Sequence, residues 1–113
     1  FKRIFPIIIK PAIMGFMTSP SHSRKDLYAL LSAIDNPKEA ELLLTDLLTP
    51  NELSSLEERW QEIQLLARGM TQRDVAKKLG ISISKVTRGS QALQHGTGGF
   101  RLFLKKLGKK MID

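Results

Sequence analysis

The chain has 113 residues, enough for one domain, and its 42% hydrophobic and 26% charged residues are ordinary for a folded protein. It contains no cysteine, which excludes disulfides and thiolate metal sites, and no apolar run long enough to span a membrane. The net charge of +7 is unevenly distributed: residues 35–62 carry eight acidic and two basic residues, whereas residues 67–113 carry eleven basic and two acidic ones. This division favours a polyanionic partner for the basic half, although ordinary solvated helix faces explain the same charges.

The first sixteen residues, FKRIFPIIIKPAIMGF, differ from the rest of the chain. Pro6 and Pro11 interrupt any helix, and the apolar run is too broken for a typical signal peptide. Met17 opens a polar stretch. We therefore predict that residues 1–20 are a flexible arm or an extension upstream of the natural start, and that residues 21–113 form the folded domain.

Two helices are predicted next. The stretch SRKDLYALLSAI, residues 23–34, places leucines and an isoleucine at helical spacing. Asp35-Asn36-Pro37 ends this helix and begins a second one through KEAELLLTDLL, residues 38–48. His22 and His95 lie in polar or glycine-rich contexts, so we predict that neither binds metal or takes part in catalysis.

The longest predicted helix follows a capping box. In Thr49-Pro50-Asn51-Glu52, the Thr49 hydroxyl can accept from the Glu52 amide while the Glu52 side chain reaches back. The helix runs to about Ala67, and Gly69 ends it. Its apolar residues step by three and four positions to form one stripe: Leu53, Leu56, Trp60, Ile63 and Leu66 or Ala67.

The stretch TQRDVAKKLGISISKVTRGS, residues 71–90, predicts two short helices joined at Gly80, which supplies a left-handed turn. Thr71-Gln72-Arg73-Asp74 predicts a second capping box, and either Ser82 or Ser84 caps the next helix. A small residue, a glycine four positions later and an aliphatic residue six positions after that are typical of a DNA-binding helix-turn-helix. A generic helical hairpin also accommodates a glycine at its corner.

The two faces of this unit carry different residue types. The residues expected to face the core are Val75, Ala76, Leu79, Ile81, Ile83 and Val86. The residues expected to contact DNA are Gln72, Arg73, Lys77, Ile83, Ser84, Lys85 and Thr87. Glutamine and arginine pair with base edges, whereas serine, threonine and lysine suit phosphates or bases. Ile83 belongs to both sets.

The last predicted helix begins near Gly99. Phe100, Phe103, Leu104 and Leu107 share one side of it, and lysines lie on the other, so we expect the aromatic side to face a dimer core. No segment has the alternating pattern of a strand. The sequence therefore predicts an all-α fold of about six helices.

Two segments, LLTPNELSSLEERW and LLARGMTQRDVAKKLGISISKVTRGSQAL, resemble the bacterial tryptophan repressor family over residues 47–93. The run VTRGSQAL, residues 86–93, is close to one typical of that family. Together with the upstream LTP and Arg59, it is more specific than helix-turn-helix spacing alone. The resemblance implies an intertwined homodimer with six helices per chain, from which two helix-turn-helix units project.

The resemblance also implies operator DNA as a partner and L-tryptophan as a corepressor, a ligand that is not a catalytic cofactor. The indole would lie between Arg59 and Arg88, and Arg88 would also pair with the ligand carboxylate. Thr49 of the partner subunit would contact that carboxylate, Gly89 would leave room beside the ring, and Ile63 would line it. Ordinary alternatives are a surface ion pair for Arg59, a phosphate contact for Arg88 and an N-cap for Thr49.

Three departures from the family pattern affect these expectations. Ala92 stands where the family has a serine that helps to hold the ligand amino group, which favours an indole ligand without an amine as an alternative. Ala76 and Lys85 stand where the family has lysine and threonine, so the preferred operator is open. One residue is missing within LLARGMTQ.

The sequence thus predicts a cytoplasmic transcriptional repressor that binds operator DNA as a homodimer when it is loaded with L-tryptophan. It is not predicted to be an enzyme, because no Ser/His or Cys/His set is present. The alternatives are a related DNA-binding regulator with a different effector or none, a DNA-binding module of a mobile-element recombinase, and an interaction protein whose basic face meets an acidic protein.

Overall fold

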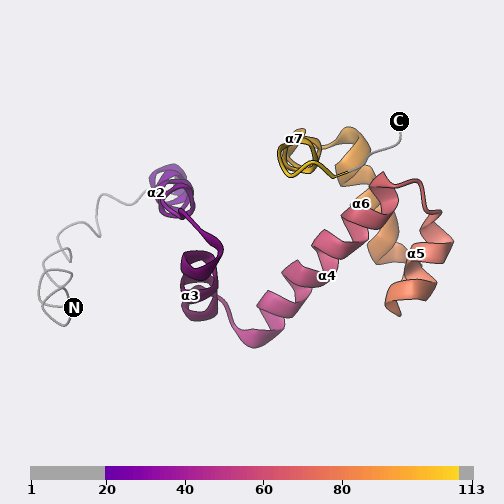
Figure 1. Ribbon diagram of the computed structural model, residues 1–113, viewed down its shortest axis with the longest axis horizontal. Coiled ribbons are helices and arrows are strands. Elements are labelled where there is room, and N and C mark those ends of the chain that lie inside the picture. The colour runs from indigo at the N-terminus through magenta and orange to yellow at the C-terminus, as the bar shows by residue number, and fades with distance from the viewer. Residues whose placement is uncertain (1–19, 110–113) are drawn as a thin grey trace, which may run out of the picture. The chain divides into compact units, whose positions relative to one another are not determined.

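The computed structural model describes residues 20–109, and this range contains six α-helices and no strand (Figure 1). The helices are α2 (Pro20–Ser32), α3 (Pro37–Leu47), α4 (Pro50–Ala67), α5 (Gln72–Leu79), α6 (Ile83–His95) and α7 (Gly99–Lys106). The predicted all-α class is confirmed. The arm predicted for residues 1–20 lies outside the described residues, apart from Pro20, so the domain division at residue 21 stays a prediction.

The chain divides into two compact units between Leu44 and Thr45. The described part of the first unit consists of α2 and most of α3, and none of the side chains described there is buried. Leu27, Leu30 and Leu31, which form the apolar stripe that predicts α2, are each more than one third exposed. This stripe is therefore left uncovered within the described part of the first unit.

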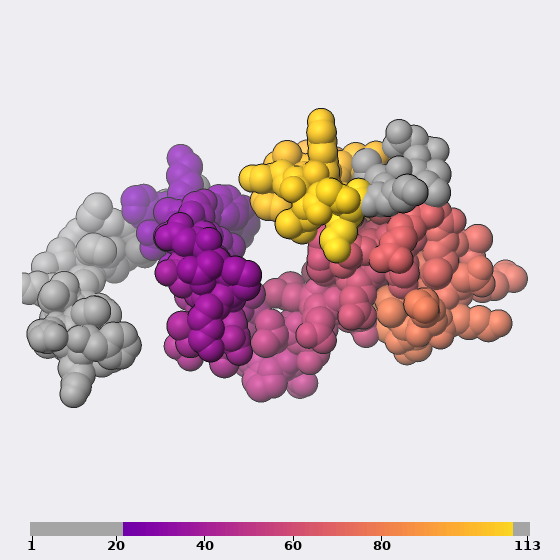
Figure 2. Space-filling model, in the orientation of Figure 1, coloured from indigo at the N-terminus to yellow at the C-terminus, as the bar shows by residue number. Residues whose placement is uncertain are grey.

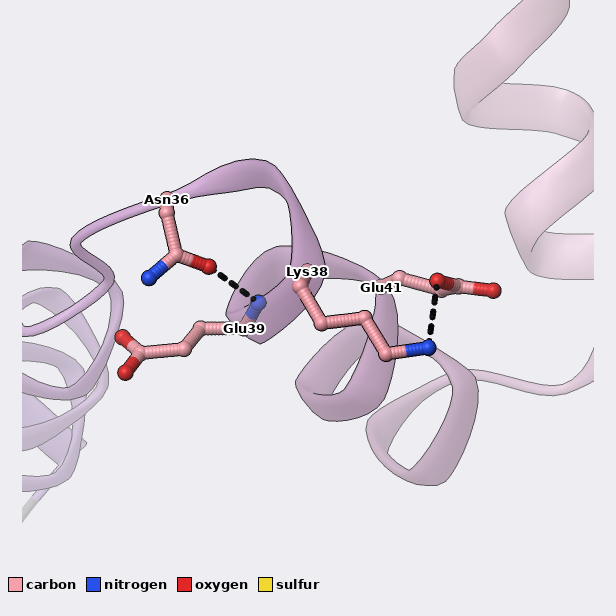
Figure 3. Close-up of polar contacts among 4 residues, drawn as sticks. All are labelled: Asn36, Lys38, Glu39 and Glu41. Carbon is pink, nitrogen blue, oxygen red and sulfur yellow. Dashed lines mark hydrogen bonds and ion pairs between the residues drawn. The ribbon is translucent and has the colours of Figure 1, made fainter.

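The start of α3 is stabilised by local hydrogen bonds. Figure 3 shows Asn36, whose Oδ1 accepts from the backbone N–H of Glu39 at 2.9 Å. The Glu39 carboxylate in turn accepts from the backbone N–H of Asp35 at 3.0 Å. The same view shows an exposed ion pair of 3.3 Å between Lys38 and Glu41. These contacts confirm the predicted helix start at Asp35-Asn36-Pro37.

Helix α2 ends at Ser32, two residues before the predicted end at Ile34. The backbone N–H groups of Ala33 and Ile34 bond to carbonyls three residues back, at 3.1 and 3.3 Å, so the chain tightens and leaves the α-helix there.

The second unit begins its first complete helix, α4, with the predicted capping box. The Thr49 hydroxyl accepts from the Glu52 N–H at 3.2 Å, and the Glu52 carboxylate accepts from the Thr49 N–H at 2.8 Å. At its other end, α4 stops before Gly69, whose φ of 96° is a left-handed conformation that favours glycine. Both predicted ends of α4 are confirmed.

Helix α6 packs against α4, α5 and α7, and two groups of buried side chains hold these helices together. The first group joins α4, α6 and α7 through Ile63, Ala67, Leu93 and Leu104. The second joins α4, α5 and α6 through Leu65, Val75 and Val86. Leu66 contacts both groups, so the end of α4 is the common support of the helix-turn-helix and of α7.

Helix α7 buries only part of the side that the sequence predicts to be apolar. Leu104 is fully buried and Phe100 is partly buried against Trp60, at 6.4 Å between ring centroids. Phe103 is 50% exposed and Leu107 is 58% exposed. Phe103 therefore does not face the core of its own chain, and its expected place in a dimer core stays a prediction.

Within residues 20–109, no helix combines the length and the apolar character needed to cross a membrane. The same residues contain no group of three acidic or histidine side chains placed to hold a metal ion.

Candidate ligand pocket and helix-turn-helix surface

The corner between α5 and α6 has the geometry of a helix-turn-helix. Gly80 has φ 67° and ψ 36°, the left-handed conformation expected there, and its N–H donates to the Ala76 carbonyl. The N–H of Ile81 donates to the same carbonyl at 3.1 Å, and Ile81 packs against the buried Val75 and Val86. Gly80 thus turns the chain, and Ile81 fills the corner.

Hydroxyl caps begin both helices of this unit. Ser82, one of the two predicted alternatives, accepts from the Lys85 N–H at 3.2 Å. Thr71 accepts from the Asp74 N–H at 3.1 Å, but the reciprocal bond of the predicted capping box is not formed. Aspartate is one methylene shorter than glutamate, which explains why this second box is only half made.

The predicted core face of the unit is correct except at Ile83. Val75 and Val86 are fully buried, and Ala76 and Leu79 pack against them. Ile83 is 50% exposed and does not face the core. It is the first residue of α6, and Ile81 already occupies the corner that would otherwise receive it.

The residues predicted to contact DNA lie on the surface. In Figure 2, the orange atoms of α5 and of the start of α6 occupy one edge of the second unit. The exposed members of the set are Arg73, Lys77, Ile83, Ser84, Lys85 and Thr87, and Gln72 is partly buried. Their role in DNA binding stays a prediction.

Two of these residues bond to each other across the corner. The Thr87 hydroxyl donates to Gln72 Oε1 at 2.8 Å, which links the start of α5 to a residue near the start of α6. This bond orients the Gln72 amide and leaves its two N–H groups available as donors, with no acceptor among the described residues. The sequence pattern places both residues on one face but does not indicate that they pair.

Lys85 points back toward α4. Its ammonium forms a 3.2 Å ion pair with the Glu58 carboxylate, whose side chain is 34% exposed. The helix that carries the predicted DNA contacts is thereby tied to α4 beside a pocket that both residues line. Such a partly exposed pair contributes little to stability, about 0–1 kcal/mol, and responds to any new charge nearby.

This pocket has a volume of about 380 Å³ and lies between α4 and α6, with one residue from α7. Its lining is mostly charged on the α4 and α6 walls. The lining residues are Ser55, Glu58, Arg59 and Glu62 from α4, Lys85, Arg88, Gly89 and Ala92 from α6, and Phe100 from α7.

Three of the five residues predicted to bind the ligand meet in this pocket: Arg59, Arg88 and Gly89. Neither guanidinium group has a hydrogen bond or an ion pair with another described residue, so both are available to an anion. Ile63 does not line the pocket, because its side chain is fully buried in the core with Ala67 and Leu93. The wall expected from Ile63 is formed instead by its neighbour Glu62 and by Phe100.

Thr49 also lies outside this pocket, since it caps α4 three turns before Arg59. The contact that the sequence implies for it comes from a second subunit and stays a prediction. Ala92 does line the pocket, so the wall of α6 lacks a hydroxyl group at this position.

Glu62 is one of the pocket residues that the sequence pattern did not single out. The residue is only 3% exposed, and its Oε1 is buried with no hydrogen-bond partner among the described residues. Burial raises the pKa of the Glu62 carboxyl above its usual range, opposed by Arg59 and Lys85 and assisted by Glu58. A signal was present, because Glu62 follows Glu58 and Arg59 at helical spacing and so shares their face.

Gly89 lies directly against Glu62. A Cβ added to Gly89 would overlap the Glu62 carboxyl oxygen Oε1, so only glycine fits opposite this side chain as it stands. The space that the sequence assigns to a ligand ring beside Gly89 is thus partly filled by a carboxyl group.

Comparison with known proteins identifies the family. The family model described as Trp repressor protein matches residues 23–108, which is most of the chain. A Trp operon repressor homolog from Chlamydia caviae is 40% identical over 86 residues, covering 75% of this chain and 85% of that protein. The chain belongs to the Trp repressor family.

Further relatives agree with this membership. A Trp operon repressor homolog from Xylella fastidiosa is 37% identical over 81 residues, covering 71% of this chain and 86% of that protein. The crystal structure of a TrpR-like protein from Eubacterium eligens superposes with a TM-score of 0.73, covering 87% of this chain and 99% of that chain. At 23% identity, this last likeness supports the fold alone.

The resemblance in residues 47–93 is therefore confirmed, and so is the all-α class. The Trp repressor family is a family of regulators, which agrees with the prediction of a transcriptional regulator.

Proposed function

We propose that this chain is a transcriptional repressor that binds operator DNA as a homodimer when L-tryptophan occupies the pocket between α4 and α6. The observation that carries the proposal is that α6 contributes to both sites. One side of α6 supplies Lys85, Arg88, Gly89 and Ala92 to the pocket, and its exposed start carries Ser84 and Thr87 beside α5. A ligand in the pocket therefore contacts the helix that would read the DNA.

The pocket suits an aromatic amino acid. Its volume of about 380 Å³ lies within the usual range for small-molecule sites. The unpaired guanidinium of Arg88 provides a partner for the ligand carboxylate, and the flat guanidinium groups of Arg59 and Arg88 stack on an indole face. Phe100 adds an apolar wall.

The homodimer is supported by the apolar surface left uncovered on one chain. Tyr28 and Leu42 in the first unit are 56% and 58% exposed. In the second unit, a hollow of about 520 Å³ is lined mainly by apolar residues, including Trp60, Phe100 and Phe103. Isolated amphipathic helices of this length are marginal in water, so these faces require a cover. A second copy of the chain supplies matching faces and brings Thr49 of the partner subunit into reach of a ligand.

DNA binding is supported by the charge and exposure of the helix-turn-helix. Arg73 and Lys77 on α5 are exposed cations suited to phosphates, and the free amide N–H groups of Gln72 suit base acceptors. In a two-fold dimer the two α6 starts would enter successive major grooves about 34 Å apart. Such a repressor acts in the cytoplasm of a bacterium, where the operator lies.

Coupling between the two sites follows from differential affinity. L-tryptophan can favour DNA binding only if it binds more tightly to the arrangement of α5 and α6 that fits two grooves. The Lys85–Glu58 ion pair in the lining of the pocket is the contact most exposed to this effect, since a ligand carboxylate adds a negative charge beside Lys85.

The direct test is calorimetric titration of the full chain with L-tryptophan, and with indole-3-propionate and tyrosine as comparison ligands. We expect saturable binding at one site per chain. Arg88→Ala should weaken it by about 10- to 100-fold, because a charge-assisted bond to the carboxylate is lost. Arg73→Ala is the matched control, since Arg73 is an exposed arginine outside the pocket, and should leave tryptophan affinity unchanged.

A second candidate is a DNA-binding regulator with another effector. It is favoured by Ala92, which offers no hydroxyl to a ligand amino group. Tighter binding of indole-3-propionate than of L-tryptophan would select this candidate.

The DNA half of the proposal is tested separately. Selection from random duplexes, with and without L-tryptophan, should enrich a two-fold symmetric site only when the ligand is present. Salt-independent binding, or no binding to any duplex, would favour an acidic protein partner for the basic face instead.

A further inference from the structure

The Glu62 carboxyl group is an unusual wall for a ligand pocket. It lines the cavity together with Arg59, Arg88 and Lys85, yet none of these cations bonds to it. Lys85 is instead paired with Glu58 at 3.2 Å. Glu62 Oε1 therefore remains a buried acceptor without a donor among the described residues, and such groups are rare because an unpaired buried acceptor loses its hydration without compensation.

The surroundings of Glu62 place its acceptor beside α6. Gly89 on α6 lies against Oε1, and any larger residue there would displace the carboxyl group. The rest of the residue is held by α4, where the adjacent Ile63 is fully buried in the core. The acceptor therefore lies between α4 and α6, directly beside Gly89.

A buried acceptor that lines a cavity is satisfied when the occupant brings a donor. We propose that Glu62 is a specificity-determining residue of this pocket, and that its carboxylate accepts a hydrogen bond from the ring N–H of a bound indole. This inference rests on the proposed function, in which the occupant is an indole amino acid.

The ring N–H, and not the ammonium group, is the donor that fits. The ammonium and the carboxylate of an α-amino acid share one carbon atom, so pairing of the carboxylate with the Arg88 guanidinium keeps the ammonium near that group. Glu62 Oε1 lies against the backbone of Gly89 and fills part of the space there, so a ring bound in the rest of the pocket lies beside this carboxyl group. An N–H on the ring edge therefore reaches Glu62, whereas an analogue with sulfur in place of this nitrogen leaves the carboxylate unpaired.

The test compares two ligands of nearly the same shape. L-tryptophan and its sulfur isostere, 3-(1-benzothiophen-3-yl)-L-alanine, are titrated calorimetrically into the full chain. We expect the wild type to prefer tryptophan by about 10- to 100-fold, the effect of leaving one buried acceptor unpaired. In Glu62→Ile the preference should fall to within about 3-fold, because the acceptor is gone. In Glu62→Gln, which keeps a carbonyl acceptor, part of the preference should remain.

Two controls separate this effect from a general loss of structure. Glu57→Gln removes the same charge from an exposed position on α4 outside the pocket and should keep the full preference. A measurement on the wild type alone does not depend on any variant: the proton on the labelled indole nitrogen of bound tryptophan should shift downfield in the NMR spectrum and exchange slowly with water.

The outcomes distinguish the two proposals. Tryptophan binding that depends on Arg88 but shows no preference over the isostere in the wild type would overturn the role of Glu62 and leave the proposed function standing. A preference that survives in Glu62→Ile would also overturn it. Failure of both ligands to bind the folded wild type would overturn the tryptophan proposal itself, and the role of Glu62 with it.

Discussion

The first and second units of this chain are both built from amphipathic helices, but they differ in what covers the apolar side chains. In the second unit, α4, α5, α6 and α7 bury each other's faces around Ile63, Val75, Val86 and Leu104. In the first unit, no described side chain is buried, and Leu27, Leu30 and Leu31 remain accessible. Within the described residues, the second unit forms its pocket by contacts within one chain, whereas the apolar faces of the first unit are left uncovered. We therefore expect the first unit to depend on the proposed homodimer more than the second unit does.

The largest expected effect comes from placing a charge on the uncovered face of the first unit. Leu31→Asp should abolish the homodimer, because a carboxylate buried at an interface without a partner costs about 3–5 kcal/mol. Sedimentation equilibrium would measure the change in mass. Ser32→Asp places the same charge on the neighbouring residue of α2, outside the leucine stripe, and should remain dimeric. Equal dissociation of both variants, or of neither, would mean that this stripe does not form the interface.

In the second unit, shortening a core side chain should lower the stability of the fold. Ile63→Ala should lower the free energy of unfolding by about 2–5 kcal/mol, since a fully buried side chain is replaced by a cavity. Urea unfolding would measure this loss. Lys78→Ala, an exposed change on α5, should stay within about 0.5 kcal/mol of the wild type. If Ile63→Ala unfolded the protein no more readily than Lys78→Ala, the second unit would not depend on its own core.

The two units should also differ in how much their lysines contribute to DNA binding. Lys77→Ala on α5 should reduce the slope of log K against log salt for DNA binding by about 1, because one phosphate contact is lost. Lys38→Ala removes a lysine from the first unit that is already paired with Glu41, and it should leave the slope unchanged. Titration of a fluorescent duplex at several salt concentrations would compare them. A larger change in Lys38→Ala would move the DNA-binding surface to the first unit.

Local features of the fold could be predicted from the sequence because neighbouring residues determine them. The Thr49–Glu52 capping box and the left-handed turn at Gly80 both depend on a few consecutive residues. The exposure of Ile83 could not be predicted in this way, because it depends on Ile81 filling the corner first. Ile83 is the first residue of α6, where no preceding turn fixes the direction of its side chain, so the helical period does not predict its burial.

The candidate site shows the same limit. Arg59 and Arg88 could be placed together because the family resemblance relates two distant segments, and both line the pocket. The burial of Glu62 could not be predicted, because a charged residue on a helix is normally solvated. Gly89 lies against Glu62 from another helix, and no local sequence pattern connects the two.

The smallest expected effect is a dependence of stability on pH that originates at Glu62. Burial raises the pKa of this carboxyl in the folded chain above the ordinary value of 4.5, although Arg59 and Lys85 oppose the shift. Between 4.5 and the raised pKa, the folded chain holds a proton that the unfolded chain has lost, so the free energy of unfolding falls as the pH rises through this window. Glu62→Gln cannot lose that proton. The variant should therefore gain stability relative to the wild type as the pH rises above 4.5, and the gain should vanish below it.

The affinity for L-tryptophan should depend on pH in the opposite direction to the free energy of unfolding. Glu62 faces Arg59 and Glu58 from its own helix and Lys85 and Arg88 from α6, and none of these supplies it with a hydrogen bond. A ring N–H that bonds to the ionised carboxylate lowers its pKa, so tryptophan binding should release a proton and become tighter as the pH rises through the same window. Calorimetry in two buffers with different ionisation enthalpies would measure the released proton. Its absence in Glu62→Gln and its persistence in Glu57→Gln would assign it to the buried carboxyl, because only Glu62 combines burial with a place in the pocket wall.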